Sequence, residues 1–432
     1  MKMANMDDYF DVVIVGTGAA GLYCALNLPA RYRILLLTKQ KADESDSFLA
    51  QGGICMQHGE ADYRPFFDDT MRAGHYENNP ATVDLMIRSS NSIIRDLVRR
   101  GVRFARDDHG ALRFTREGAH SRPRILFHED ITGHEITQTL LNEVLRCENI
   151  ELREHTTLLD FFADASACGG VIAAGPDGEP RAIGAGAVVL ACGGIGGLYK
   201  NSTNFPHITG DAIAMALRHG VACEHLDYIQ IHPTTLYSHR KGRRFLISES
   251  VRGEGALLLD KNGNRFTNEL QPRDVVSAAI RAQMEKDGTD HVWEDMRPIG
   301  EAAIREHFPN ILERCEEEGY DPIHEPIPVV PAQHYFMGGI TADLSSRTAL
   351  PRLYACGETC CNGVHGRNRL ASNSLLESLV FAQRAADDIL YGEPLVFTGD
   401  KPDLAPYREQ EPLFAAYRQE VLTAIERSKN HE

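Results

Sequence analysis

The stretch DVVIVGTGAAGLYCALNL, residues 11–28, decides the fold of this chain. An apolar strand, Asp11–Val15, runs directly into the glycine turn Gly16-Thr17-Gly18-Ala19-Ala20-Gly21, and Leu22–Leu28 has the character of a helix. A second buried strand follows at Ile34–Thr38. This order of strand, glycine turn, helix and strand opens a Rossmann-type unit, which binds a dinucleotide.

Each glycine of this turn has a physical role. Gly16 permits the tight turn, Gly18 lets the backbone approach a pyrophosphate, and Gly21 lets helix and strand pack closely. The helix N-terminus offers unpaired N–H groups and a partial positive charge to the phosphate. At the end of the second strand, where an acidic residue usually binds a ribose, the chain has Thr38 and Lys39. This difference argues against a simple NAD site.

The rest of the chain alternates helical and strand patterns, with a change of composition near Gly220. From there to about Val330, prolines, charges and polar loops predict an inserted capping domain. We expect helices at 80–106 (one or two), 133–146, 273–286, 299–318, 374–390 and 413–429, and strands at 150–153, 171–174, 187–191 and 353–355, with a hairpin turn at 175–178.

The predicted fold class is therefore α/β, with a Rossmann-type domain into which an α+β capping domain is inserted. The first domain takes residues 1–219 and returns at 337–390, the capping domain takes 220–336, and 391–432 form a short helical tail. A chain of 432 residues is too long for one hydrophobic core, which agrees with this division.

Charge and cysteine usage narrow the class of protein. The net charge of −16 repels phosphate backbones and anionic lipids, so we expect neither nucleic acid nor membrane as a partner. The N-terminus lacks a secretory signal pattern, and no stretch approaches the ~20 apolar residues of a membrane helix. The ten cysteines follow no metal-binding spacing. The sequence predicts reduced thiols, a cytoplasmic protein and no metal site.

Four cationic or potentially cationic side chains lie in short segments of loop character: His232, Arg273, His334 and Arg369. Arginine forks bind carboxylates through two hydrogen bonds, and histidines add donors. Two arginines and two histidines could hold the two carboxylates of a small dicarboxylate. Taken singly, each is more commonly a surface arginine or a loop histidine with its hydrogen bonds satisfied, and the sequence alone does not show that they converge.

Several separated motifs carry a resemblance to a known family. They are GTGAAG at 16–21, AQGGI at 50–54, ACGG at 191–194, TGDAIAMA at 209–216, HPT at 232–234, SESVRGEG at 248–255, PRD at 272–274, QHYFMGGI at 333–340, ACGE at 355–358 and NRLASNSLLE at 368–377. With these motifs, the chain from about Asp11 to Leu390 resembles the flavoprotein family of succinate dehydrogenase, fumarate reductase and L-aspartate oxidase, which often lacks the acidic ribose residue.

The resemblance implies FAD in the first domain and a capping domain that closes over a dicarboxylate. Arg273, Glu249 and Arg252 match positions that resemble a proton relay, although a free arginine is a poor base. We expect Arg273 to position the substrate and to take part in proton transfer. The implied FAD contacts are Gly16, Thr17, Gly18, Ala19, Ala20, Gly21, Lys39, Ser45, Asp46, Ser47, Ala50, Gln51, Gly52, Gly53, Asp211, Glu358, Ser374 and Leu375; the implied substrate contacts are Gln230, His232, Ser248, Glu117, His334 and Arg369, beside Arg273.

Two features bear on the branch of the family. The membrane-bound dehydrogenases attach FAD covalently through a histidine just before the AQGG-like motif, where this chain has Asp46, so we expect non-covalent FAD. The segment Thr115-Arg116-Glu117-Gly118 resembles one characteristic of the oxidase branch. A buried substrate ammonium needs a carboxylate partner, and Glu117 would supply it. Without the resemblance, a surface glutamate among neighbouring arginines would be the better interpretation of Glu117.

The resemblance thus implies FAD-dependent oxidation of L-aspartate to iminosuccinate, with oxygen (giving hydrogen peroxide) or fumarate as electron acceptor. The product would feed quinolinate and NAD synthesis, through a transient contact with quinolinate synthase. The alternatives are a soluble enzyme like fumarate reductase or succinate dehydrogenase, a non-catalytic dicarboxylate- or flavin-binding protein, and an electron-transfer subunit. Members of the oxidase branch usually carry a further C-terminal helical domain, which we expect to be missing or very short here.

Overall fold

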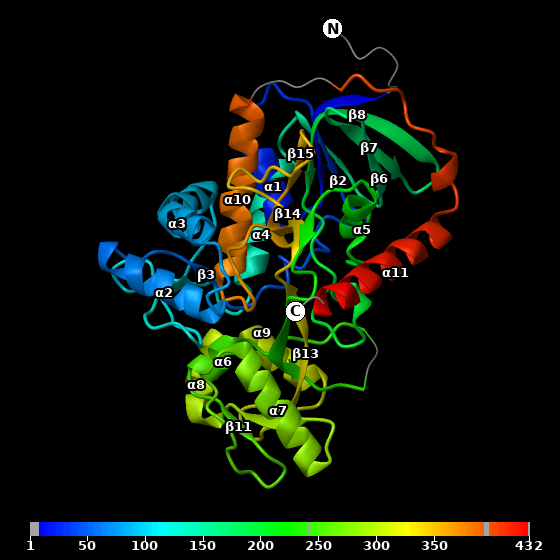
Figure 1. Ribbon diagram of the computed structural model, residues 1–432. Coiled ribbons are helices and arrows are strands. Elements are labelled where there is room, and N and C mark those ends of the chain that lie inside the picture. The colour runs from blue at the N-terminus through cyan, green and yellow to red at the C-terminus, as the bar shows by residue number, and fades with distance from the viewer. Residues whose placement is uncertain (1–7, 240–241, 393–396, 431–432) are drawn as a thin grey trace.

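A seven-stranded sheet forms the centre of the upper part of the protein (Figure 1). The computed structural model describes residues 8–239, 242–392 and 397–430. The strands lie in the order β5-β2-β1-β8-β7-β6, and β15 pairs with β8. Their bounds are β1 Tyr9–Val15, β2 Ile34–Leu37, β5 Ile150–Arg153, β6 Thr157–Ala163, β7 Cys168–Ala174, β8 Pro180–Leu190 and β15 Leu353–Ala355.

Strand β8 takes part in two kinds of pairing. Its first half, up to Gly184, pairs antiparallel with β7 through the predicted hairpin at 175–178. Its second half, Val188–Leu190, lies parallel between β1 and β15. The sequence predicted only this second half, because the first half, with two glycines and three alanines among residues 180–187, has little of the β-branched pattern of a strand.

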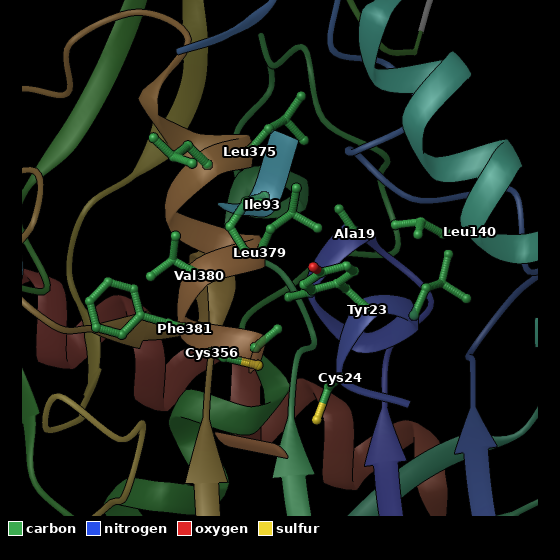
Figure 2. Close-up of a cluster of buried hydrophobic side chains, with 14 of the residues drawn as sticks. Ala19, Tyr23, Cys24, Ile93, Leu140, Cys356, Leu375, Leu379, Val380 and Phe381 are labelled. Atoms are coloured by element: carbon green, nitrogen blue, oxygen red, sulfur yellow. The ribbon is translucent and has the colours of Figure 1, made fainter. Parts of the chain in front are cut away.

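Helices cover both faces of the central parallel strands, which is why β2 and the second half of β8 are apolar throughout, whereas the edge strand β5 carries Glu151 and Arg153. Val12 and Ile14 of β1 face one helical layer, whereas Val13 and Val15 face the other. In the first layer (Figure 2), side chains of α1, α3, α4 and α10 meet in one cluster of buried hydrophobic residues. These helices are α1 Ala19–Asn27, α3 Pro80–Arg100, α4 Thr132–Val144 and α10 Asn373–Tyr391; the second layer contains α5 Asp211–Arg218 and α11 Gln410–Lys429.

Smaller elements connect this part to the rest. The predicted helical region 80–106 is one helix, and it ends where Gly101 adopts a left-handed conformation with φ of 105°. Helix α2 was not predicted. The small elements are α2 Tyr63–Ala73, β3 Ile54–Cys55, β4 Ile125–Leu126, β9 Cys223–Glu224, β14 Gly339–Thr341 and β16 Cys360–Cys361.

The lower unit in Figure 1 has a core of its own, drawn from residues between Leu236 and Val329. Its antiparallel sheet has the order β10-β13-β12-β11. The prediction of a single helix at 299–318 is wrong, because the structure has two helices there. The first helix ends before Phe308, and Pro309, which has no backbone N–H, starts the second. The elements are β10 Ile229–Leu236, β11 Leu257–Leu259, β12 Val292–Asp295, β13 Ile327–Phe336, α6 Glu249–Gly253, α7 Arg273–Asp287, α8 Glu301–His307 and α9 Pro309–Glu317.

One carboxyl group in this lower core is costly. Glu294 of β12 is fully buried, and among the described residues neither of its carboxylate oxygens has a hydrogen-bond partner. Burial raises the pKa of Glu294 to about 8. A carboxyl group whose pKa is higher in the folded state loses stability as pH rises from its unfolded pKa of about 4.3 toward its folded value.

We therefore expect Glu294→Leu to raise the free energy of unfolding of the lower unit. The difference from the parent should increase by roughly 3–4 kcal/mol between pH 5 and pH 8. Trp293, the only tryptophan of the chain, lies beside Glu294 on β12, so its fluorescence can follow urea unfolding of this unit. As a control, Glu316→Leu makes the same substitution on the exposed surface of α9, where no buried carboxyl group is removed. If the difference in the free energy of unfolding between Glu294→Leu and the parent did not change with pH, the interpretation of Glu294 as a buried, unpaired carboxyl group would be wrong.

Candidate active site

A single cleft joins the glycine turn of the first domain to the lower unit. Its volume is about 1710 Å³, including open solvent at its mouth. Gly16 and Lys39 line one end, and all four predicted cationic residues line the other. Gly16 and Arg369, which are 353 positions apart in the chain, therefore line one cleft.

At the first end, the glycines act through close backbone contacts. Gly16 has φ of 116°, and a Cβ atom there would lie 2.0 Å from the carbonyl oxygen of Ala191. A Cβ atom at Gly21 would lie 1.9 Å from the carbonyl oxygen of Gly16. Thr17, Gly18 and Ala20 line the cleft, whereas Ala19 and Gly21 do not. The turn can therefore hold this shape only with glycine at 16 and 21, and it presents the start of α1 to the cleft.

Lys39 occupies the place of the missing acidic residue. Its Nζ lies 2.7 Å from Oδ2 of Asp211, in the first turn of α5. Lys39 also lies over the ring of Phe414 in α11, at 4.8 Å from the centroid. This charged pair closes the cleft at the side of the second helical layer.

Several polar atoms of the cleft lack partners. Ser45 Oγ, Asp46 Oδ2 and Gln51 Oε1 line the cleft, are buried, and have no hydrogen-bond partner among the described residues. Such atoms are costly unless a ligand meets them. The cleft therefore fits a large polar ligand such as a dinucleotide. The other predicted cofactor positions on its wall are Ser47, Ala50, Gly52, Gly53, Asp211, Glu358, Ser374 and Leu375.

Two of these positions carry carboxyl groups with raised pKa values. Burial raises the pKa of Asp46 to about 7, and its Oδ1 accepts a hydrogen bond from the backbone N–H of Phe205 at 2.9 Å. Burial raises the pKa of Glu358 to about 8, and the Asp46 carboxyl adds to this shift. Glu358 accepts a hydrogen bond from the backbone N–H of Phe336 at 2.9 Å. Near pH 7, Glu358 therefore favours the neutral form and Asp46 is about half neutral, which suits contact with polar rather than cationic ligand atoms.

At the other end of the cleft, Arg273 lies at the centre of a buried hydrogen-bond network. It is the first residue of α7, and its Nε donates to Glu249 Oε2 at 2.6 Å. Its Nη1 donates to Gln230 Oε1 at 2.9 Å, and the same oxygen accepts from Arg369 Nε at 3.3 Å. Gln230 is not on the cleft lining and instead holds the two guanidinium groups side by side. Two adjacent forks of this kind can bind two carboxylates.

The two predicted histidines line the same end of the cleft. The ring centroids of His232 and His334 lie 5.1 Å apart at 71°. His334 Nδ1 contacts Thr203 Oγ1 at 2.7 Å, and His232 Nδ1 contacts Thr234. His232 Nε2 is buried and has no partner among the described residues. Burial, reinforced by Arg273, holds the pKa of both imidazoles well below the usual range, so both rings are neutral.

Glu117 lies on the same cleft lining, with Glu249 and Arg273 as its charged neighbours. It is buried; its Oε1 accepts from Ser250 Oγ at 2.8 Å and its Oε2 from Ser372 Oγ at 2.6 Å. Burial and the neighbouring charge of Glu249 raise the pKa of Glu117. A ligand cation beside Glu117 would offset both effects. Ser250 and Ser372 were not predicted as site residues, although both lie in motifs quoted above.

The predicted relay residues differ in their contacts. Burial favours a higher pKa for Glu249, but the charges of Arg273 and Arg252 outweigh it and lower the pKa. Arg252 is buried, lies off the cleft lining, and donates through Nη1 to the carbonyl oxygen of Glu269 at 2.8 Å. Ser248 lines the cleft and caps the N-terminus of α6. Arg273 can thus reach a ligand directly, whereas Arg252 acts on Glu249 through its charge.

Two general properties of the described residues can be stated here. None of their helices is both long and apolar enough to span a bilayer. Within the same residues, histidine, cysteine and acidic side chains nowhere gather in threes as a metal site requires.

Comparison with known proteins places this site in a family. The model of the FAD binding domain family matches residues 11–375. An L-aspartate oxidase of Clostridium perfringens is 48% identical over 380 residues, 88% of this chain and 86% of that protein. One of Clostridium acetobutylicum is 44% identical over 417 residues, 96% of each chain. The structure of an E. coli quinol fumarate reductase has a TM-score of 0.84 at 32% identity and covers 95% of this chain and 74% of that chain. The chain therefore belongs to the L-aspartate oxidase family, within the flavoproteins that share this FAD-binding domain.

Proposed function

We propose that this chain oxidises L-aspartate to iminosuccinate with FAD as its cofactor. The observation that carries the proposal is the position of Glu117 in one buried cluster with Arg273 and Arg369. L-Aspartate has two carboxylates for the arginines and one ammonium for the glutamate. The relatives named L-aspartate oxidases support the same substrate.

FAD would bind non-covalently along the glycine-turn end of the cleft. Asp46, unlike the histidine of the covalent flavoproteins, has no nitrogen to bond to the cofactor. The unpaired polar atoms of Ser45, Asp46 and Gln51 would meet its polar groups. Once bound, FAD supplies the two-electron acceptor for the reaction. The lower unit would act as the capping domain over this cleft.

The residues of the other end would fix the substrate. Arg273 and Arg369 would each hold a carboxylate through a forked pair of hydrogen bonds, and His232 and His334 would add ring nitrogens. Glu117 would hold the ammonium group and so orient the carbon that loses its hydrogen. Two electrons and two protons leave L-aspartate; oxygen would take them to give hydrogen peroxide, or fumarate to give succinate. With fumarate as acceptor, Arg273, Glu249 and Arg252 would supply a proton.

The second candidate is a fumarate reductase, because the same cationic groups would bind fumarate without any use for Glu117. The structural similarity to a quinol fumarate reductase favours this alternative. For an aspartate oxidase, the product would feed quinolinate and NAD synthesis. Iminosuccinate is an imine that water hydrolyses, so a transient contact with quinolinate synthase would protect it.

The first test is to purify the yellow protein and mix it anaerobically with L-aspartate and, separately, with succinate. We expect L-aspartate to bleach the flavin absorbance, and air to restore it with formation of peroxide. Denaturation should release the flavin into solution. If L-aspartate does not bleach the flavin but fumarate reoxidises chemically reduced protein, the oxidase proposal is wrong and the second candidate stands.

A further inference from the structure

A buried network lies behind Glu117, away from the cleft lining, and the roles proposed above make no use of it. His120 and Arg124 form its centre; both are buried and neither lines the cleft. Arg124 is fixed by two carboxylates: its Nη2 donates to Asp62 Oδ1 at 2.9 Å and its Nη1 to Asp69 Oδ2 at 2.8 Å. Charges buried this deeply need such pairing, so the position of Arg124 is well determined.

Arg124 also determines the proton position on His120. Its Nη1 lies 2.8 Å from His120 Nδ1, and a guanidinium group can only donate. Nδ1 must therefore accept, which leaves the ring proton on Nε2. From there His120 donates to the carbonyl oxygen of Ala371 at 3.0 Å. Burial lowers the pKa of His120 to about 4, which keeps the ring neutral and this tautomer intact.

The contact with Ala371 bears on Ser372. Ser372 has φ of 61°, a left-handed conformation that is uncommon for a residue other than glycine and persists only when its surroundings hold it. The peptide groups on both sides are held, at Ala371 by His120 and at Ser372 by the N–H of Cys55 at 3.0 Å. In this conformation Ser372 Oγ donates to Glu117.

The same network fixes the loop that carries Glu117. The backbone N–H of His120 donates to the carbonyl oxygen of Glu117 at 3.3 Å. The next residue, Ser121, donates to Asp69 Oδ2 through its backbone N–H at 2.8 Å and its Oγ at 2.6 Å. Arg369, in the loop before Ser372, is anchored separately by Gln230. The network thus holds the residue that would bind an ammonium group without holding the arginines that would bind carboxylates.

We propose that His120, held in one tautomer by Arg124, is a positioning residue that aligns Glu117 and Ser372 to recognise the ammonium group of an amino dicarboxylate. This inference rests on the proposed function. It predicts that changes at His120 affect the selectivity for ligands with an ammonium group and leave the binding of plain dicarboxylates unchanged.

Two unreactive ligands make the test independent of turnover. 2-Methylaspartate and 2,2-dimethylsuccinate both carry two carboxylates and lack a hydrogen on C2, and they differ only by ammonium against methyl. Binding of each to the FAD-loaded protein is measured by isothermal titration calorimetry. His120→Asn keeps a group that can reach Arg124 but not Ala371, whereas His120→Gln can still reach Ala371. His120→Phe keeps the ring volume without the hydrogen bonds and serves if His120→Asn does not fold, which thermal unfolding establishes.

We expect His120→Asn to weaken the binding of 2-methylaspartate about 10-fold and that of 2,2-dimethylsuccinate less than about twofold. His120→Gln should retain most of the selectivity, and in a Glu117→Gln background His120→Asn should have no further effect. Equal weakening of both ligands, no change in either, or a His120→Gln variant that behaves like His120→Asn would overturn the inference. A parent protein that binds both ligands equally would instead refute the amino-dicarboxylate function itself.

Discussion

Replacing Arg273 with glutamine is expected to lower kcat for both L-aspartate oxidation and fumarate reduction by about 10²–10³-fold. Arg273 is the cationic residue that contacts Glu249 and Gln230 and also faces the cleft. Its loss removes a fork that would bind a carboxylate and leaves the buried Glu249 without its counter-ion. Because Arg273 lowers the pKa of Glu249, the same substitution should raise that pKa.

Steady-state rates with L-aspartate and oxygen, and with fumarate and a chemical reductant, measure the effect. Arg281→Gln is the matched control, because Arg281 lies on the exposed side of the same helix. Arg273→Lys should fall between the parent and Arg273→Gln, since lysine keeps the charge but cannot form the fork. A decrease of less than about fivefold in Arg273→Gln, with flavin content unchanged, would mean that Arg273 is not a substrate-binding residue.

Glu117→Gln is expected to separate the two activities. Removing one partner of a buried charge pair costs about 2–5 kcal/mol, so kcat/KM for L-aspartate should fall roughly 30- to 5,000-fold. Fumarate has no ammonium group, and its reduction should change less than about fivefold. The glutamine keeps the size of the side chain: its amide oxygen can accept a hydrogen bond from one of Ser250 and Ser372, and its NH2 group can donate to the hydroxyl oxygen of the other.

The pH profile provides a second measurement on the same variant. Ionised Glu117 is the form that binds an ammonium group, and its pKa is raised. In the parent, kcat/KM for L-aspartate should therefore decline on the acid side at a pH above the usual pKa of glutamate, about 4.3. Glu117→Gln should lack this decline. Equal losses with both substrates would show that Glu117 supports the fold of the site and does not recognise the amino group.

Part of the fold could be predicted because its signals are local. The glycine turn at 16–21 lies between a strand and a helix within eighteen residues. The structure has β1, the turn and α1 in this order, although α1 begins at Ala19, three residues before the predicted start at Leu22. The return strand was also predicted at Leu353–Ala355, which are its bounds in the structure. By contrast, the end of α8 before Phe308 depends on one proline in an otherwise continuous helical pattern. The first half of β8 is a strand because it pairs with β7.

The candidate site was less accessible to sequence reasoning. His232, Arg273 and Arg369 belong to three separate segments, and only the fold brings them to one cleft. Gln230 holds the two arginines and is not among the residues of the cleft lining, and its expected contact with the substrate stays a prediction. Ser372 was missed because its role depends on a left-handed backbone conformation that no residue pattern indicates at a serine. Motifs identify which segments matter, whereas the contacts within them need coordinates.

The order of pairing around β8 has a consequence for the synthesis of this chain on the ribosome. Every strand of the lower sheet lies between residues 229 and 336, so that unit is contiguous in the chain. Strand β15, which covers one edge of β8, is made only after that whole unit. During this interval the nascent chain exposes the bare edge of Val188–Leu190, a template for pairing with other chains. The inserted unit, which forms the substrate end of the cleft, thus also determines the time during synthesis for which β8 lacks its partner strand β15.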